Sequence, residues 1–243
     1  MQLNIHAPSL GIGAVIAAVS ILGAFFVLGL NVSENDNPTK IKLEDNSEQV
    51  TKTSDSDNIA LSLFSAKATT LLGSQDASIT LIEFGDYQCF YCNRFFHDTE
   101  PEIVKNYVDT GKVKIIFKDF TIIGKDSLNA AHASHCANEE GKFWEYHDVL
   151  YNHWTGENNG WASSNNLIEF AKQIGLDEAA FSECMSDGRY NSVIDQSNSD
   201  AKTLGISGTP AFFVIGSDNA IVKIGGAQPY DVFVKIFESQ LKK

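Results

Sequence analysis

The sequence is poor in basic residues and in cysteine. Lysine and arginine total 18 against 31 aspartate and glutamate residues, which gives a net charge of −13. Proteins that bind nucleic acid gather positive charge opposite the phosphates, so this balance argues against nucleic-acid binding. Four cysteines in 243 residues are too few for a disulfide-rich scaffold. Because 43% of the residues are hydrophobic and 16 are phenylalanine, the chain has ample material for a packed core.

Charge is absent from residues 9–30, a run of 22 apolar or small residues. As a helix this run would be roughly 33 Å long, enough to cross a hydrocarbon layer of about 30 Å. A cleaved signal peptide would need a basic start and a shorter apolar run, yet residues 1–8 contain no lysine or arginine. The sequence therefore favours residues 1–30 as an uncleaved, single-pass N-terminal membrane anchor over a cleaved signal.

Aromatic residues are absent from residues 31–58, where acidic side chains outnumber lysines. Such a segment buries too little apolar surface to offset the entropy cost of ordering it. We expect a flexible acidic linker that spans about 30 Å. The globular domain is then residues 59–243, and the anchor would place it outside the cytoplasm.

The globular part alternates between strand and helix patterns. The expected elements are a strand over 79–84, a helix over 89–107, a strand over 113–117, a mostly helical block over 126–184, a hairpin of strands 211–215 and 221–224, and a helix over 230–241. The first strand, helix and second strand have the lengths of a right-handed parallel βαβ unit. These patterns predict an α/β fold that is interrupted by a helical segment.

The strongest chemical motif is Cys89-Phe90-Tyr91-Cys92. Two cysteines at this spacing can share a metal or close a small disulfide, but a zinc site normally needs a second ligand pair. Cys136 and Cys184 are too far apart in sequence to supply one. Because the motif follows a strand and opens a helix, the helix N-terminus would stabilise the Cys89 thiolate for attack, while Cys92 would resolve the mixed disulfide. A metal site and an inert structural pair are the alternatives.

Three motifs resemble one known family in the order expected for it. They are the runs Ile82–Cys92, Gly141–His147 and Gly208–Phe213. Together they resemble the DsbA-like thiol:disulfide oxidoreductases over residues 70–243. The resemblance implies a thioredoxin fold with an inserted α-helical domain at about 125–205. It also implies that Cys89 is the nucleophile, that Pro210 is a cis-proline beside the disulfide, and that the backbone of Thr209 pairs with the substrate peptide.

The sequence departs from this family between the two cysteines. Phe90 stands where relatives often have proline, and Tyr91 stands where the strongest oxidants have histidine. Without an imidazole the Cys89 thiolate loses one stabilising contact, and Asp86 is expected to raise the pKa of Cys89. We expect Phe90 and Tyr91 to be exposed and to give apolar contacts to unfolded polypeptides. Thr121 replaces another frequent proline, with an expected effect on a loop only.

Glu83 lies six residues before Cys89 in a strand that should be buried. A buried carboxyl group there would have a raised pKa and could relay a proton to or from Cys92. The resemblance also implies an acidic residue at this position. The alternative is a glutamate at a strand edge that faces solvent.

Cys136 and Cys184 fall in the helical block. Outside the cytoplasm two such thiols would oxidise if their Cα atoms lay within about 7 Å, and some relatives carry a disulfide at similar places. A structural disulfide is therefore favoured over two buried free thiols or a second redox relay. His132 and His135 precede Cys136 at a spacing that a metal could use, but a solvated helix face is favoured. The tryptophans and tyrosines of this block are expected to be mostly core.

The sequence thus predicts a membrane-anchored extracytoplasmic thiol:disulfide oxidoreductase that oxidises cysteines of exported or unfolded proteins through Cys89 and Cys92. No metal and no organic cofactor are expected. In such systems a quinone-linked membrane protein reoxidises the pair. The alternatives are a reductase or isomerase with the same site, and a redox-silent membrane-tethered binding module.

Overall fold

The computed structural model describes residues 70–242. The predicted anchor over residues 1–30 and linker over 31–58 lie outside the described residues. Within residues 70–242, no helix combines the length and the apolar character that crossing a membrane requires.

A five-stranded mixed sheet forms the centre of the described chain, in the order β1-β3-β2-β4-β5. The strands are β1 (Leu71–Leu72), β2 (Ile79–Gly85), β3 (Val113–Asp119), β4 (Ala211–Ile215) and β5 (Ile221–Gly225). Strands β2 and β3 pair in parallel, which confirms the expected βαβ unit, and the other neighbours are antiparallel. Almost every side chain of β2 is buried, as expected for a central strand that is covered on both faces.

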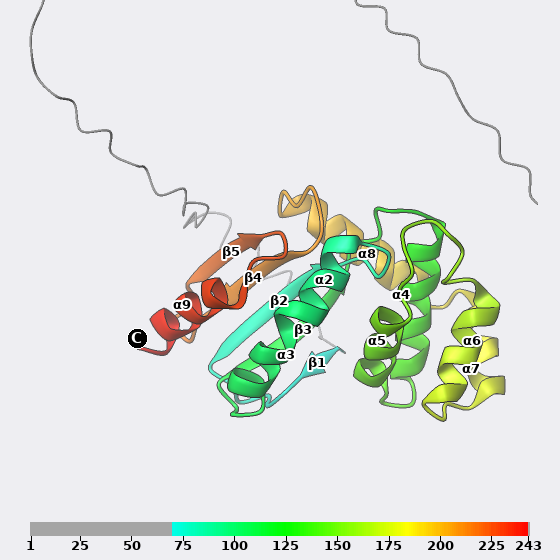
Figure 1. The fold of residues 1–243 in the computed structure, drawn as a ribbon, viewed down its shortest axis with the longest axis horizontal. Helices are drawn as coiled ribbons and strands as arrows, with labels where there is room; N and C mark the ends of the chain where they lie inside the picture. Colours follow the sequence, from blue (N-terminus) through cyan, green and yellow to red (C-terminus); the bar gives the residue numbers. More distant parts are fainter. Residues whose placement is uncertain (1–69, 243) are drawn as a thin grey trace, which may run out of the picture. The chain divides into compact units, whose positions relative to one another are not determined.

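Helices cover the sheet and form a separate block beside it (Figure 1). They are α2 (Phe90–Asp98), α3 (Glu100–Ile103), the π-helical turn η1 (Val104–Val108), α4 (Lys125–Asn138), α5 (Phe143–Asn152), α6 (Ser164–Gln173), α7 (Glu178–Asp187), α8 (Asn191–Thr203) and α9 (Tyr230–Leu241). Helices α4 to α8 all lie between β3 and β4 in sequence. This arrangement is an α/β thioredoxin fold with an α-helical insertion.

The helix expected over residues 89–107 is three elements rather than one. It breaks at Thr99, whose φ of −124° leaves the helical region. Pro101 lies in the first turn of α3 and has no backbone N–H to continue the hydrogen bonds of α2. The helical block also continues past its expected end at Cys184, because Gly188 ends α7 with a φ of +66° and α8 follows.

The insertion shares one hydrophobic core with the loop that carries Cys89, with the start of α2 and with Phe117 of β3. Tyr87, Cys89 and Cys92 belong to the same buried cluster as residues of α4, α5, α6 and α7. A second cluster packs α2 and α9 against the sheet. The two cysteines of the motif therefore lie where the insertion meets the sheet.

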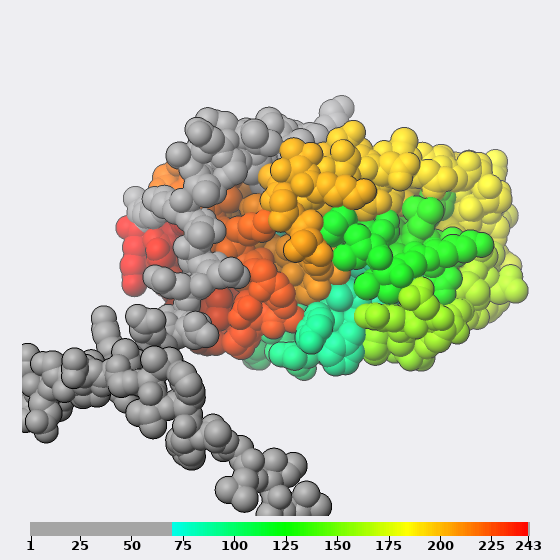
Figure 2. Space-filling view, turned by 90° about the horizontal axis from the view of Figure 1, so that it is seen from above, coloured from blue at the N-terminus to red at the C-terminus, as the bar shows by residue number. Residues whose placement is uncertain are grey.

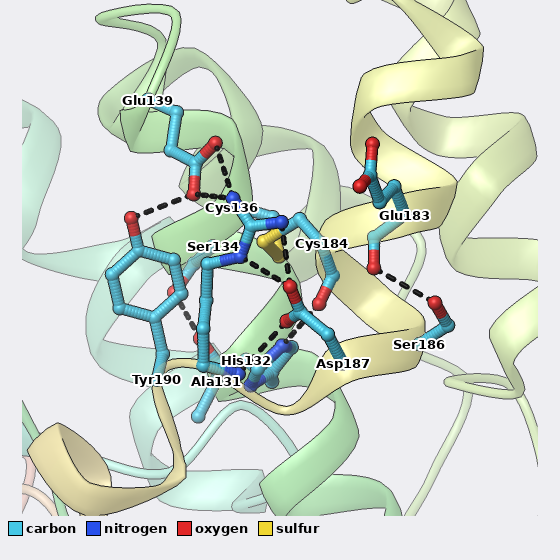
Figure 3. Close-up of a disulfide and its surroundings, with 11 residues drawn as sticks. Ala131, His132, Ser134, Cys136, Glu139, Glu183, Cys184, Ser186, Asp187 and Tyr190 are labelled. Atoms are coloured by element: carbon cyan, nitrogen blue, oxygen red, sulfur yellow. Dashed lines mark hydrogen bonds and ion pairs between the residues drawn. A yellow bond between two sulfur atoms is a disulfide. The ribbon is translucent and has the colours of Figure 1, made fainter.

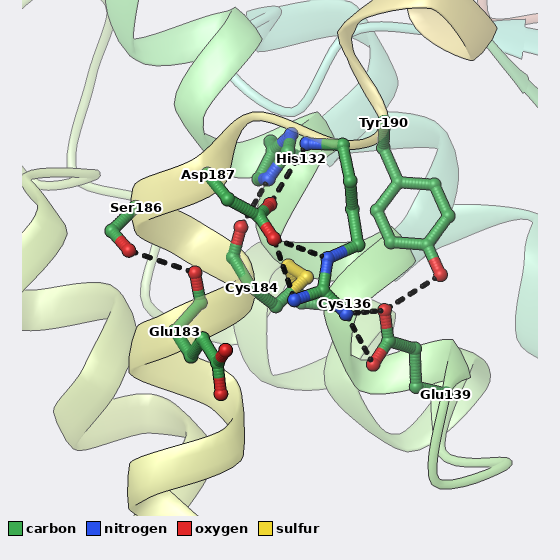
Figure 4. Close-up of polar contacts among 9 residues, drawn as sticks. His132, Cys136, Glu139, Glu183, Cys184, Ser186, Asp187 and Tyr190 are labelled. Atoms are coloured by element: carbon green, nitrogen blue, oxygen red, sulfur yellow. Dashed lines mark hydrogen bonds and ion pairs between the residues drawn. A yellow bond between two sulfur atoms is a disulfide. The ribbon is translucent and has the colours of Figure 1, made fainter.

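A disulfide between Cys136 and Cys184 links α4 to α7 inside the insertion (Figure 3). Their Cα atoms are 5.8 Å apart, within the range that the sequence argument required. The ends of the two helices are also tied at the surface, because Arg189 pairs with Asp187 and with Glu139. Figure 4 shows Glu139 and Asp187 around the disulfide.

The expectation of a solvated face at His132 and His135 is wrong. Both side chains are buried, at 4% and 5% exposure. The Nε2 atom of His132 hydrogen-bonds to the Cys184 carbonyl oxygen at 2.9 Å, and Nε2 of His135 bonds to Asp119 at 2.7 Å. These contacts pin α4 to α7 and to the end of β3, so the histidines hold the insertion together.

Candidate active site

Cys89 lies at the junction of β2 and α2. A short loop follows Gly85, and Cys89 is the N-cap residue of α2. The Asp86 carboxylate fixes this loop, because it accepts hydrogen bonds from the backbone N–H groups of Gln88, Ile122 and Ile123 at 2.8–3.0 Å. Cys89 is thereby presented at the start of a helix, where unpaired N–H groups favour a negative charge.

The environment of Cys89 lowers its pKa to about 6. The largest cause is a hydrogen bond from the Cys92 thiol; the Thr209 side chain and the amides of Cys92 and Tyr91 add to it, while burial opposes it. Asp86 was expected to raise this pKa, but its carboxylate is directed at three backbone amides, and the net effect of the surroundings is a lowered pKa. Both cysteines of the motif are free thiols in the structure, which corresponds to the reduced state.

Cys92 has the opposite character. Its side chain is fully buried, and burial raises its pKa well above the ordinary range of a thiol. The hydrogen bond to Cys89 and the charges of Cys89 and Glu83 act in the same direction. At neutral pH the pair thus consists of a Cys89 thiolate and a neutral Cys92 thiol.

Glu83 is buried in β2 at 3% exposure, so it does not face solvent as a strand-edge residue would. Burial raises its pKa well above the usual range, and nearby Glu100 and Cys89 raise it further. A buried carboxyl group with a raised pKa can exchange a proton with a nearby thiol, as the acid when protonated and as the base when ionised.

Glu100, at the start of α3, is a second buried carboxyl group near Glu83, and it was not among the residues predicted from the sequence. Its exposure is 5%, and burial together with the charge of Asp148 raises its pKa to about 8. Helical spacing could have found it, because Glu100 lies four residues after Phe96 and three before Ile103, on the apolar face of the expected helix.

The loop before β4 forms the opposite wall of the site. The Thr209-Pro210 peptide bond is cis, and the Cys89 thiol donates a hydrogen bond to the Thr209 carbonyl oxygen at 3.3 Å. The Thr209 hydroxyl is buried, and the Thr209 side chain is one of the groups that lower the pKa of Cys89. Beside this loop lies a hollow of about 490 Å³, lined by residues 205–211, Lys223, Gly225 and Gly226.

Phe90 and Tyr91 are exposed at 48% and 54%, as expected from the sequence. Their rings contact each other, and the Phe90 ring also contacts Trp154, with centroids 5.9 Å apart. Trp154 comes from the loop between α5 and α6, so it borders the site rather than serving only the core. Figure 2 shows the start of α2, in blue-green, at the surface between the yellow-green insertion and the orange C-terminal segment.

His147, the last residue of the Gly141–His147 motif, supports the structure of the site. His147 is fully buried, and burial lowers its pKa to about 3, so it is neutral. Its Nδ1 atom hydrogen-bonds to the Tyr87 hydroxyl at 3.1 Å. This contact joins α5 to the loop that presents Cys89.

A metal site is weakly supported among the described residues. His132, Cys136 and Cys184 bring three candidate ligand atoms within 4.8 Å of one another. The two sulfur atoms are bonded to each other, however, and a metal requires the thiolates. The donor set therefore does not fit a metal in this state.

Comparisons with known proteins agree with the geometry. A thioredoxin family model matches residues 65–235. Disulfide bond formation protein D of Bacillus subtilis is 29% identical over 181 residues, which cover 73% of this chain and 79% of that protein. A putative protein-disulfide oxidoreductase of Rickettsia bellii is 27% identical over 151 residues, which cover 60% of this chain and 56% of that protein.

Solved structures show the same fold. Oxidised BdbD of Bacillus subtilis superposes with a TM-score of 0.67 at 30% identity, over 74% of this chain and 96% of that one. The α-DsbA1 protein of Wolbachia pipientis gives a TM-score of 0.64 at 28% identity, over 70% and 89% of the two chains. These findings confirm the resemblance that the three sequence motifs indicated. The chain belongs to the thioredoxin family and, within it, is a DsbA-like thiol:disulfide oxidoreductase.

Proposed function

We propose that this enzyme is anchored to a membrane and oxidises the cysteines of exported proteins on the extracytoplasmic side. The observation that carries the direction of reaction is the lowered pKa of Cys89, at about 6. A stabilised thiolate favours the reduced enzyme, and an enzyme whose reduced form is stabilised is a good oxidant. The Bacillus relative that is named a disulfide bond formation protein supports the same direction.

The reaction begins with the oxidised enzyme, in which Cys89 and Cys92 form a disulfide. A substrate thiolate attacks the Cys89 sulfur, a mixed disulfide forms, and Cys92 leaves and takes a proton. Glu83 is the proposed donor, since it is buried, its pKa is raised, and it interacts with Cys92. A second substrate thiolate then attacks the substrate sulfur of the mixed disulfide, so that the substrate gains a disulfide and Cys89 leaves as a thiolate.

The substrate peptide is proposed to lie along the hollow beside Pro210. The backbone of Thr209 would pair with it as an added strand, and Phe90 and Tyr91 would contact its apolar side chains. The accepted electrons would pass to a quinone-linked membrane protein, and the apolar run over residues 9–30 would keep the domain near that partner.

Trapping tests whether the site exchanges disulfides. Replacement of Cys92 by serine removes the resolving thiol, so the full chain should accumulate mixed disulfides with many substrates through Cys89. The Cys89→Ser variant is the matched control and should trap none. A C92S variant that traps nothing would favour the redox-silent binding module.

The reduction potential tests the direction. We expect a value between about −120 and −180 mV from equilibration in glutathione buffers, as for known oxidants and isomerases. A value near about −270 mV would identify a reductase and contradict the proposed direction.

Extraction from membranes tests the anchor. If the full chain is extracted by detergent but not by alkaline carbonate, the result would support the anchor, and release by carbonate would contradict it.

A further inference from the structure

The loop between α5 and α6 is hydrogen-bonded to both neighbours of Cys89. Gln88, which precedes Cys89 and is fully buried, accepts two hydrogen bonds from this loop. The indole Nε1 of Trp154 donates to the Gln88 carbonyl oxygen at 2.7 Å, and the backbone N–H of Asn158 donates to Gln88 Oε1 at 2.6 Å. The Gln88 amide nitrogen in turn donates to Ser127 Oγ in α4 at 3.1 Å. The insertion therefore holds this loop in a defined place beside the site.

Glu157 lies in the same loop and reaches the residue that follows Cys89. Its Oε1 atom accepts a hydrogen bond from the backbone N–H of Phe90 at 3.1 Å. This N–H is the first of α2, and the N-cap residue, Cys89, makes no side-chain capping bond of its own. Glu157 thus caps α2 from a distance of 67 residues in sequence.

The capped helix end is the same one that stabilises the Cys89 thiolate. The next two amides, of Tyr91 and Cys92, act on the thiolate, while the amide of Phe90 is taken by the carboxylate. A negative charge at this position competes with the thiolate for the helix N-terminus and repels it.

The other ionisable groups around Cys89 do not place a second negative charge on the first amide of α2. The raised pKa of Cys92 keeps it a neutral thiol near pH 7, and burial raises the pKa of Glu83, which favours its neutral form. Asp86 directs its carboxylate at the amides of Gln88, Ile122 and Ile123. Arg94, in the next turn of α2, lies over the Tyr91 ring and pairs with Asp98.

We propose that Glu157 is a positioning residue that moderates the oxidising strength of the enzyme, because its carboxylate occupies the first amide of α2 and opposes the Cys89 thiolate. The inference rests on the proposed role of Cys89 as the nucleophile. It assigns to the helical insertion a direct electrostatic influence on the redox pair of the thioredoxin fold.

Replacement of Glu157 by glutamine tests the charge alone, since the amide oxygen can still accept from Phe90. We would titrate the reduced full chain in detergent by the ultraviolet absorbance of the thiolate, and equilibrate it with glutathione. In E157Q the thiolate should form at a pH lower by about half a unit. The equilibrium constant should shift about threefold toward the reduced enzyme, which corresponds to about 14 mV. High salt should shrink both differences, because Glu157 is exposed.

Glu183→Gln, at an exposed position on α7, is the matched control and should titrate like the wild type. An E157Q variant with wild-type stability, titration and equilibrium constant would overturn the inference. If E157Q proves unstable, the Glu157→Ala variant separates a structural role from the proposed electrostatic one. A purely structural cap predicts a lower melting temperature and an unchanged Cys89 titration, whereas the proposal predicts a shifted titration. A wild-type enzyme with no thiolate that titrates near pH 6 would instead contradict the proposed role of Cys89, whatever Glu157 does.

Discussion

At the scale of single residues, two cysteines three positions apart have opposite acid-base character. Cys89 is the N-cap of α2 and receives hydrogen bonds from a thiol and from backbone amides, so its pKa falls to about 6. Cys92 is one turn further along and fully buried, so its pKa rises. This difference is the basis of the proposed roles, in which Cys89 is attacked and Cys92 resolves.

The Thr209 hydroxyl should contribute to the reactivity of Cys89. Replacement of Thr209 by valine keeps the shape but removes the donor, and we expect the pKa of Cys89 to rise by about one unit. Alkylation of the reduced enzyme at pH 6 should then slow about fivefold, because less thiolate is present. The Thr203→Val variant, at an exposed position on α8, is the control. An unchanged alkylation rate in T209V would show that the hydroxyl does not reach the thiolate.

Glu100 should make the stability of the fold depend on pH. Its pKa is about 8 in the folded state and about 4.3 in an unfolded chain. Between these values the folded state holds the proton and the unfolded state does not, so stability falls as the pH rises from about 4.3 to about 8. We therefore expect Glu100→Gln to stabilise the protein by a few kcal/mol more at pH 8 than at pH 5 in urea unfolding. An equal difference at both pH values would contradict the raised pKa.

The site residues that could be predicted from the sequence are those whose chemistry depends on near neighbours. The spacing of Cys89 and Cys92 and the strand position of Glu83 are local features. Glu157 could not be predicted from the sequence, because it contacts Phe90 from a position 67 residues away in the chain. The partners of Asp86 could not be identified for a related reason, since Ile122 and Ile123 come from the loop after β3.

At the scale of elements, the periodicity of apolar residues predicted where helices and strands lie more accurately than it predicted where they begin and end. The hairpin over 211–215 and 221–225 and helix α9 fall where the pattern predicted, because apolar runs and turn residues mark them clearly. Strand β1 has only two residues and is defined by its pairing with β3, so no sequence period could reveal it. The break at Thr99 depends on Pro101, a signal that the helical pattern concealed.

The disulfide between α4 and α7 should stabilise the insertion. It closes a loop of 48 residues, for which loop entropy gives about 4 kcal/mol of stabilisation. The double variant Cys136→Ser and Cys184→Ser should lose about that amount in urea unfolding, yet keep the glutathione equilibrium of Cys89 and Cys92. The single variant Cys136→Ser serves as the comparison, because it should lose the same stability. A changed redox equilibrium would show instead that the second pair exchanges with the first.

At the scale of the whole molecule, the helical insertion is part of the active site. Its core is continuous with the two cysteines, and its loop supplies Trp154 and Glu157 to their surroundings. The three sequence motifs indicated the family and the presence of the insertion. They did not indicate how closely the insertion contacts Cys89, because those contacts join segments far apart in the chain.

The order of the strands has a consequence for how the protein folds during its synthesis. Strand β2 pairs with β4, whose first residue is made more than a hundred residues after the last residue of β2. At about 5–20 residues per second this delay lasts several seconds or more, and during it the central strand has one open edge. Cys89 is then without the Thr209 wall. A chain at this stage would carry a reactive thiol without the cover that the folded protein gives it.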